Sequence, residues 1–427
     1  MPRRMAQKGT AMLALMDCNN FYVSCERCFQ PKLRGKPTIV LSNNDGCAVA
    51  RSEESKALGV KMGDPWHLYK EEWRRQGVVI RSSNYALYGD MSNRVMSILR
   101  KLTPGVEVYS IDEAFLDFAG LDCREEAIAR ELRATIVQWT GIPVSIGIAP
   151  TKTLAKVANR AAKKDKASGG VMALQDAIAQ EAVLAALEVE DVWGIAARMG
   201  QRLRALGISK AVDLRNAAPK LLRDEGGVVL ERIGRELRGE QCLLLEDTTQ
   251  AAKSIMASRS FGRPVVECAE LEEAVSSFVS RAAEKLRRQN LAAGSIMVFA
   301  HTNPFKATER QYSASDVVRL GVASSDTAKL IQAALQGVRK IYRPGFRYKK
   351  AGIMLDGLEQ SNHVQGDLWT APDDERSKAL MQTMDRLNRS HGKGTLRHAS
   401  CGVRQGWSMR AEHMSRRWTT RWEELLT

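Results

Sequence analysis

Three carboxylates occupy positions at which they could hold metal ions together. Asp17 follows an apolar run, and the adjacent pair Asp112 and Glu113 lies between two further apolar segments. A site of carboxylate oxygens, without imidazole or thiolate ligands, suits a hard cation such as Mg²⁺. Two such ions about 3.5–4 Å apart hold the attacking and leaving oxygens of an in-line phosphoryl displacement. The three acids therefore indicate phosphoryl-transfer chemistry.

A row of cations could serve the same chemistry. Lys152, Lys156 and Arg160 are spaced i, i+4 and i+8, which places them on one face of a helix. A cation beside a triphosphate stabilises the charge that develops on a leaving pyrophosphate. The alternative interpretation is a solvent-exposed helix face, which the spacing alone does not exclude.

Short strands and helices must position these residues. Apolar runs and their flanking residues predict strands at AMLALM (11–16), TIVL (38–41) and PVSIGIA (143–149), and helices that end at Leu58 and span 151–164. VEVYSI (106–111) and AFLDF (114–118) predict two strands joined by a turn with Asp112 and Glu113 at its tip. This alternation predicts an α/β or α+β first domain.

Length and charge indicate several domains and a polyanionic partner. The chain has 427 residues, too many for one core, and a net charge of +15, which is typical of proteins that bind nucleic-acid phosphates. Only Cys25 and Cys28 are spaced C-x-x-C, so reduced thiols are expected rather than a zinc site. No apolar run approaches the roughly 18 residues of a membrane span. A cytoplasmic protein is expected.

Five strings in the sequence resemble motifs of one enzyme family. DCNNFYVSCE (17–26), SIDEAFLD (110–117) and GIAPTKTLAKVAN (147–159) resemble, in this order, three motifs of the Y-family DNA polymerases. VLSNNDGCAVAR (40–51) and KALGVKMGDPW (56–66) resemble the UmuC-type members of that family. The resemblance extends from about residue 12 almost to the C-terminus.

The resemblance implies an α+β multidomain fold of the right-hand polymerase type. The expected domains are a palm at 11–21 and 86–179, fingers at 22–85, a helical thumb at 180–247, a little finger at 253–357 and a C-terminal tail at 358–427. The implied function is error-prone, translesion, DNA-directed DNA synthesis in damage tolerance of the SOS type. The implied substrates are primer-template DNA and deoxynucleoside triphosphates.

The resemblance also assigns the catalytic metal ligands. Asp17, Asp112 and Glu113 match the acids that hold two Mg²⁺ ions, and the backbone carbonyl of Cys18 is expected on one of them. These positions agree with the metal site that the residue types indicate by themselves.

Four further positions are expected near the nucleotide. Tyr22 matches the aromatic steric gate that excludes a 2′-hydroxyl, and Glu26 matches an acid that supports the site. Lys156 matches a lysine that contacts the triphosphate. Lys56 can serve there as a point charge, whereas Glu53 stands where many relatives have a tyrosine and cannot donate to a phosphate.

Two segments are expected to contact DNA. VWGIAARMGQRLRALGI (192–208) resembles a helix-hairpin-helix, which offers backbone N–H groups to a phosphate. Gly194 keeps the first of its two usual glycines, and Ala196 replaces the second. The little-finger residues expected against the duplex backbone are Arg339, Lys340, Arg343, Arg347, Lys349 and Lys350.

The expected protein partners follow from the tail and from the family. Gln365-Gly366-Asp367-Leu368-Trp369 resembles a peptide that docks on the bacterial sliding clamp, with Gln365, Leu368 and Trp369 as its anchors. The UmuC-type resemblance implies a UmuD′-type dimer and a RecA filament as activating partners. It also implies a bacterial, nucleoid-associated location.

Two other classes of protein are alternatives. A non-catalytic DNA-binding paralogue would keep the basic surface, but it would need neither the acidic triad nor Lys156. Another palm-type enzyme, such as a nucleotidyl cyclase, would use the same metals. Tyr22 and the helix-hairpin-helix favour a DNA product over a cyclic nucleotide.

Overall fold

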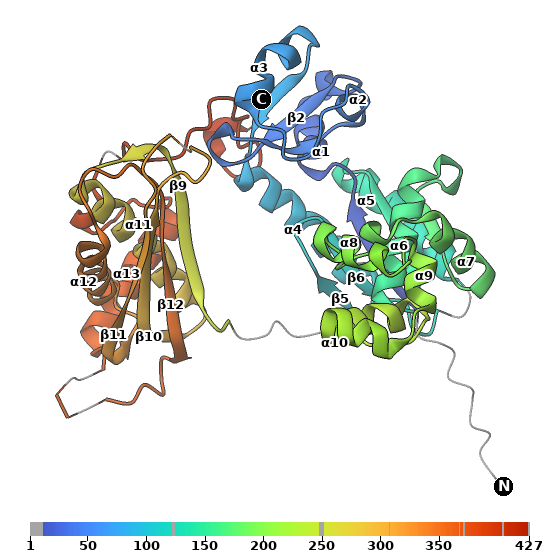
Figure 1. Cartoon of the computed structure of the whole chain (residues 1–427). Helices are drawn as coiled ribbons and strands as arrows, with labels where there is room; N and C mark the ends of the chain where they lie inside the picture. Colours follow the sequence, from blue (N-terminus) through green and yellow to red (C-terminus); the bar gives the residue numbers. More distant parts are fainter. Residues whose placement is uncertain are drawn as a thin grey trace. The chain divides into compact units, whose positions relative to one another are not determined.

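The chain divides into two units, which are described separately (Figure 1). The computed structural model describes residues 12–121, 124–246, 252–306, 308–366, 368–369, 372–403 and 405–425. The first unit comprises Met1–Ser42, Gly46–Thr249 and His413–Thr427, and the second comprises Asn43–Asp45 and Gln250–Glu412. Within the described ranges, no helix combines the length and the apolar character that a membrane crossing requires.

A five-stranded sheet lies at the centre of the first unit, in the order β5-β6-β1-β7-β8. Its strands are β1 (Leu13–Cys18), β5 (Val106–Val108), β6 (Glu113–Asp117), β7 (Val144–Ala149) and β8 (Val171–Ala173). The central strand β1 pairs antiparallel with both β6 and β7, and β5 pairs antiparallel with β6. The strands predicted at 11–16 and 143–149, and the strand–turn–strand at 106–118, are thereby confirmed.

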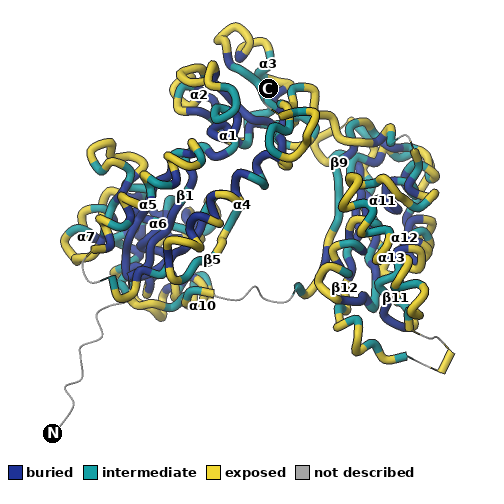
Figure 2. Tube along the Cα trace, turned by 180° about the vertical axis from the view of Figure 1, so that it is seen from behind, coloured by how far each residue is buried: buried dark blue, intermediate teal, exposed yellow. Residues whose placement is uncertain are grey.

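Helices cover both faces of this sheet. Ala14 and Met16 of β1 share a core with α4 (Tyr85–Leu102) and α5 (Glu125–Thr140). Leu15 belongs to a second core, together with α6 (Lys152–Lys164). Because side chains alternate along a strand, Asp17 lies on the same face as Leu15, toward α6. Figure 2 shows the chain buried along β1 and α6.

Helix α6 lies unusually close to the sheet. A Cβ atom at Gly147 would come within 2.1 Å of the Asn159 backbone nitrogen and within 2.4 Å of the Ala155 carbonyl oxygen. Only glycine allows this approach. The buried Asn159 amide donates to the carbonyls of Leu15 (3.2 Å) and Ser145 (2.8 Å), which ties the helix to two strands. The helix predicted over 151–164 is confirmed, and the third motif explains its position.

The segment expected to form the fingers contains a small sheet in the order β3-β2-β4. Its elements are α1 (Phe21–Phe29), β2 (Thr38–Leu41), β3 (Ala48–Arg51), α2 (Glu53–Ala57), α3 (Trp66–Arg75) and β4 (Val79–Ser82). The strand predicted at TIVL is confirmed. The helix predicted to end near Leu58 begins only at Glu53, because residues 48–51 pair with β2 instead.

The expected thumb segment is helical, with α7 (Ala177–Ala186), α8 (Ala197–Ala205), α9 (Ala211–Asn216) and α10 (Pro219–Leu237). Gly194 has φ +91°, a conformation that favours glycine. Ala196 caps the N-terminus of α8 with φ −89°, a conformation open to any L-residue. The replacement of the second hairpin glycine by alanine is therefore compatible with the backbone.

The second unit has a four-stranded antiparallel sheet in the order β11-β10-β12-β9. Its elements are β9 (Ile255–Val265), α11 (Cys268–Arg288), β10 (Leu291–His301), β11 (Ser313–Ser324), α12 (Thr327–Ile341), β12 (Tyr348–Gln360) and α13 (Glu375–Ser390). Helices α11 and α12 share a core with the sheet. Helix α13, which the sequence interpretation did not include, is held by a two-pronged pair between Arg287 and Asp385 at 2.7 Å.

Short 3-10 turns complete the described chain: η1 (Pro31–Leu33), η2 (Asn43–Asp45), η3 (Lys166–Ser168), η4 (Val189–Asp191), η5 (Ala399–Cys401) and η6 (Trp422–Glu424). The seven cysteines in the described part of the chain are free thiols, and Cys123 lies outside the described residues.

Candidate active site

The predicted acids come together where β1 and β6 run side by side. Asp17 and Glu113 are direct cross-strand partners in the antiparallel register. The backbone N–H of Cys18 donates to the Asp112 carbonyl at 2.8 Å, which holds the second acidic segment against the end of β1. Residues that are 95 positions apart in the chain are thus brought together by one pair of strands.

Ser110 shapes the turn that carries Asp112 and Glu113. Its hydroxyl donates to the Asp112 carboxylate at 2.6 Å. The same oxygen accepts from the backbone N–H groups of Asp112 (3.2 Å) and Glu113 (3.1 Å). This is a local side-chain turn of the kind that serine forms readily. It lets two adjacent acids leave a regular strand geometry, in which they would point to opposite faces.

Two lysines of α6 contact the acids. Lys156 lies 3.0 Å from Glu113, as expected for a residue at this site, and Lys163 lies 2.6 Å from Asp17. Burial raises the pKa of Asp17 to about 7, although the ion pair with Lys163 acts in the opposite direction. Desolvation disfavours the charged carboxylate unless a cation is close. A positive charge beside these carboxylates is therefore electrostatically favourable.

The donor set fits hard cations. Within the described ranges, no three His, Cys, Asp or Glu side chains are already gathered around one point as a metal site. Instead, the oxygens of Asp17 and Glu113 are paired with lysine amines. Carboxylates that lie on two neighbouring strands, and whose charges are balanced by lysines, suit Mg²⁺ as an alternative partner.

Aromatic rings surround the Lys156 amine. Its nitrogen lies 4.4 Å from the ring centre of Tyr109, 5.2 Å from that of Trp193 and 5.8 Å from that of Phe115. Trp193 belongs to the hairpin segment, and its indole N–H donates to the Tyr109 hydroxyl at 3.2 Å. Cation–π contacts of this kind hold an ammonium group in place.

The other cations of the predicted row lie outside this cluster. Lys152 is buried and pairs with Glu107 at 2.6 Å, and Arg160 pairs with Asp191 at 2.6 Å. Two members of the row, Lys152 and Lys156, are therefore largely shielded from solvent, whereas the Arg160 side chain is 41% exposed. Of the three, only Lys156 contacts an acid of the triad.

Tyr22 lies on α1 among other aromatic side chains. Its ring stacks on Tyr88 with centroids 4.4 Å apart and planes at 14°, and its edge contacts Tyr85 at 6.1 Å. Burial raises the pKa of Tyr22, and the charge of Asp112 contributes to the shift. The half-buried ring thus lies close enough to the acidic site to sense its charge.

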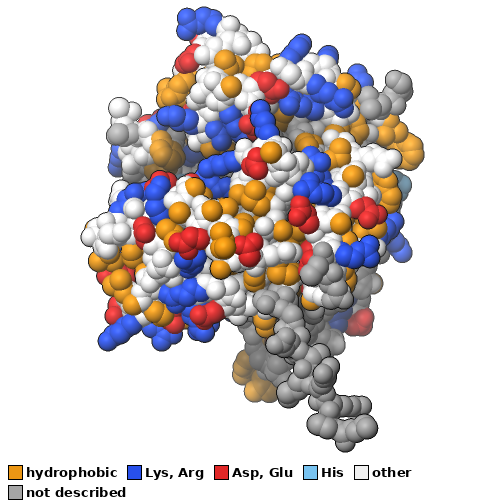
Figure 3. Space-filling view, turned by 90° about the vertical axis from the view of Figure 1, so that its right-hand side faces the viewer, with side chains coloured by type: hydrophobic (Ala, Val, Ile, Leu, Met, Phe, Trp, Pro, Cys, Tyr) orange, Lys and Arg blue, Asp and Glu red, His pale blue; other side chains and the backbone are white. Residues whose placement is uncertain are grey.

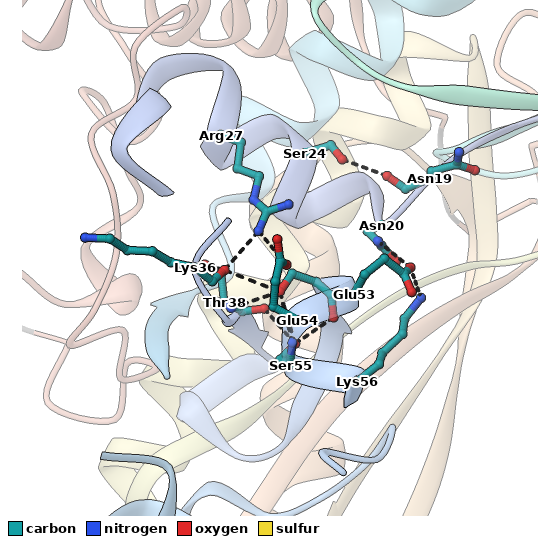
Figure 4. A network of polar contacts seen from close by, with 11 residues as sticks. Asn19, Asn20, Ser24, Arg27, Lys36, Thr38, Glu53, Glu54, Ser55 and Lys56 are labelled. Carbon is teal, nitrogen blue, oxygen red and sulfur yellow. Dashed lines mark hydrogen bonds and ion pairs between the residues drawn. The ribbon is translucent and has the colours of Figure 1, made fainter. Parts of the chain in front are cut away.

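Glu53 and Lys56 bind each other in the fingers (Figure 4). The Lys56 amine donates to Glu53 at 2.6 Å, and the Asn20 side-chain amide donates to the same oxygen at 2.9 Å. The hydrogen bond from Lys56 is the largest cause of a lowered pKa at Glu53. The structure therefore places Lys56 beside the glutamate that replaces the usual tyrosine.

The six cations expected in the little finger lie at the end of α12, at the start of β12 and in the loop between these two elements. Arg339 and Lys340 end α12 and pair with Glu272 and Asp316, and the Lys349 amine donates to the Phe261 carbonyl at 2.7 Å. The remaining members are Arg343, Arg347 and Lys350. Lys and Arg side chains, with Asp and Glu among them, also cover much of the face shown in Figure 3.

The residues expected to bind a clamp are exposed. Leu368 and Trp369 are 93% and 91% exposed, between the end of β12 and the start of α13. Gln365 is exposed as well, and Asp367 lies outside the described residues.

Lys163 and Ser110 were missed by the sequence interpretation. Lys163 follows Lys156 by seven residues and so shares its helix face. This spacing could have indicated that Lys163 lies near the same site. Ser110 precedes Asp112 by two residues, a spacing typical of side-chain turns. Neither signal reveals which carboxylate the residue contacts, because that depends on how α6 and β6 pack.

Comparison with solved structures identifies the fold as that of the Y-family DNA polymerases. A Y-family DNA polymerase chimera of Dbh and Dpo4 superposes with a TM-score of 0.65 and 22% identity, over 81% of this chain and 98% of the other. An insertion ternary complex of Dbh DNA polymerase gives 0.56 and 21%, with the same coverage. The α+β, multidomain, right-hand prediction is confirmed.

The chain belongs to the impB/mucB/samB family. That family's model matches residues 16–160, the model of its C-terminal domain matches 252–368, and a domain of unknown function matches 378–427. Protein UmuC of Salmonella typhimurium is 47% identical over 97% of this chain and 99% of its own length. DNA polymerase IV of Caulobacter vibrioides is 27% identical over 87% of this chain and 89% of its own length. The protein is a Y-family DNA polymerase, as its motifs predicted.

Proposed function

We propose that this polymerase performs two-metal nucleotidyl transfer to a primer 3′-hydroxyl during synthesis past damaged template bases, in mutagenesis of the SOS type. The observation that carries the proposal is the direct pairing of Asp17 with Glu113, with Asp112 held beside them. The described residues thus supply a cross-strand pair of carboxylates, a third acid on the adjoining turn and two lysines, which is more than DNA binding alone requires.

Asp17, Asp112 and Glu113, with the carbonyl of Cys18, would hold two Mg²⁺ ions. When bound, such ions lower the charge barrier between an attacking hydroxyl and a phosphate and stabilise the leaving pyrophosphate. The arrangement of the chain's own residues supports this assignment. The strand register sets Asp17 against Glu113, and Ser110 fixes the turn at Asp112.

Lys156 is the proposed ligand of the triphosphate. The aromatic rings around Lys156 and its ion pair with Glu113 hold the Lys156 amine at the edge of the acidic site. With Glu113 engaged as a metal ligand, the Lys156 amine would be free to donate to a phosphate oxygen, and the aromatic rings around it would still hold it in place. Lys163 forms the corresponding ion pair with Asp17. Lys56, bound to Glu53, contributes a weaker and more distant charge.

Tyr22 is the proposed steric gate. Its ring is half-buried, stacked on Tyr88 and within reach of the charge of Asp112. A rigid ring at that position would collide with a 2′-hydroxyl, whereas a deoxyribose would pass. Exclusion by a clash is an efficient way to discriminate between two similar substrates.

DNA and protein partners complete the proposal. The hairpin at Gly194 and the cations of the second unit would contact the phosphate backbone of primer-template DNA. The exposed Leu368 and Trp369, with Gln365, would dock on a sliding clamp. Activation by a UmuD′-type dimer and a RecA filament, and a cytoplasmic, nucleoid-associated location, are proposed by analogy with the UmuC-type relatives.

One primer-extension assay separates this function from its alternatives. The full chain is given Mg²⁺, single deoxynucleoside triphosphates and templates with and without an abasic site. We expect extension that follows the template base and continues past the lesion. DNA binding without extension, also when a UmuD′-type dimer and a RecA filament are added, would indicate a non-catalytic paralogue. A cyclic nucleotide formed without DNA would indicate a cyclase.

A further inference from the structure

The C-terminal segment 413–425 packs on the unit that contains the acidic site, although it belongs to a domain of unknown function. The Asn84 side-chain amide donates to the Ser415 hydroxyl at 3.0 Å and to the Arg416 carbonyl at 3.0 Å. The Trp418 ring stacks on Phe29, with planes at 11° and centroids 6.2 Å apart. These contacts join the last residues of the chain to α1 and to the start of α4.

The segment reaches a fully buried carboxylate at Glu26. One oxygen of Glu26 accepts from both the Ser415 hydroxyl (2.8 Å) and the Tyr88 hydroxyl (2.8 Å). Burial raises the pKa of Glu26, whereas these two hydrogen bonds lower it. A buried carboxylate depends on such donors, because no water replaces a donor that is lost.

Glu26 and the ring of Tyr22 belong to one connected set of contacts. Tyr22, Glu26 and Phe29 are spaced i, i+4 and i+7, so they share a face of α1. Tyr88 connects them a second time, since its hydroxyl binds Glu26 and its ring stacks on Tyr22 at 4.4 Å. The tail therefore contacts the helix face that carries Tyr22, and its Ser415 shares one oxygen of Glu26 with Tyr88, on which the ring of Tyr22 stacks.

We propose that Ser415 is a positioning residue for sugar selection, acting through Glu26 and Tyr88 on the ring of Tyr22. The inference rests on the proposed role of Tyr22 as the steric gate. Without the Ser415 hydroxyl, this oxygen of Glu26 keeps only Tyr88 as its donor, while Gln30 (3.3 Å) and Arg81 (3.9 Å) still contact the other oxygen. The carboxylate then reorients, Tyr88 moves with it, and the stacked ring of Tyr22 gains freedom. A looser ring excludes a 2′-hydroxyl less strictly.

The test compares incorporation of a deoxynucleotide and of the matching ribonucleotide by full-length variants. Ser415→Ala is expected to lower the ratio of the two kcat/KM values by about three- to tenfold, mainly because ribonucleotide incorporation rises. Ser415→Thr, which keeps the hydroxyl, is expected to restore the parent ratio. Thr420→Ala removes a hydroxyl from an exposed position of the same segment and serves as the matched control.

The outcomes separate this inference from the proposed function. If Tyr22→Ala relaxes sugar selection and Ser415→Ala leaves it unchanged, the gate stands and the role of the tail is wrong. If Tyr22→Ala also leaves selection unchanged, the gate itself is wrong and the inference fails with it. An equal loss of both efficiencies in Ser415→Ala, with a lower Tm, would mean that the segment only stabilises the fold.

Discussion

Asp17 and Glu113 face each other across antiparallel strands, and each carboxylate is paired with a lysine of the same helix, α6. The helix is therefore part of the site and not only a cover for the sheet. Its two lysines, seven residues apart, span the pair of acids. Any change in the distance between α6 and the sheet should alter both ion pairs.

Gly147→Ala tests whether that distance is set by the missing side chain. The new Cβ would meet the backbone of α6 at 2.1 Å and push the helix away. We expect the free energy of unfolding to fall by about 1–3 kcal/mol, as for other overpacked cores, and extension activity to fall as well. Gly89→Ala in α4 is the control, because a Cβ there meets nothing within 4 Å. A Tm for Gly147→Ala equal to that of the control would contradict the close approach.

Lys156→Ala tests the proposed triphosphate contact. Loss of a charged donor to phosphate is expected to lower kcat/KM for nucleotide incorporation by about 10- to 100-fold. Arg160→Ala is the matched control, since it removes one cation from the same helix but from a pair with Asp191. Steady-state kinetics on one primer-template would measure kcat/KM for both variants. Similar losses in both variants would indicate that general helix charge, and not Lys156, matters.

Tyr22→Ala tests the steric gate. Removal of the ring should open space for a 2′-hydroxyl and reduce discrimination against ribonucleotides by roughly 10- to 200-fold, the range of a single steric contact. Tyr22→Phe keeps the ring and its stacking on Tyr88, so it should retain the parent's selectivity. The measurement is the ratio of incorporation efficiencies for a deoxynucleotide and for the matching ribonucleotide. An unchanged ratio in Tyr22→Ala would assign the ring to packing alone.

Replacement of Leu368 and Trp369 by alanine tests clamp docking. Tethering raises the effective concentration of enzyme at the primer end without new DNA contacts. The double variant should therefore lose clamp-stimulated synthesis and keep clamp-free extension of a short primer. Phe305→Ala is a suitable control, because Phe305 is 94% exposed elsewhere in the second unit. Undiminished stimulation in the double variant would place the docking site in another segment.

Local sequence predicted the strands that carry the acids, because short apolar runs such as LALM before Asp17 have few other ways to bury themselves. It failed at Ala48–Arg51, where AVAR suits a helix but pairs with β2. The acids and Lys156 were predictable from motifs. The contact of Ser415 with Glu26 was not, since it joins residues 389 positions apart through packing that no local pattern encodes.

Single-turnover extension by Asp112→Asn, measured beside its affinity for primer-template DNA, tests the central claim most directly. The amide keeps the size of the side chain and removes the charge that would hold Mg²⁺. Because metal stabilisation of the transition state contributes several kcal/mol, the rate should fall by about a thousandfold or more. DNA affinity should stay within about twofold, since it comes from contacts with phosphates. A variant that extends primers at nearly the parent rate would contradict the assignment of the acidic triad.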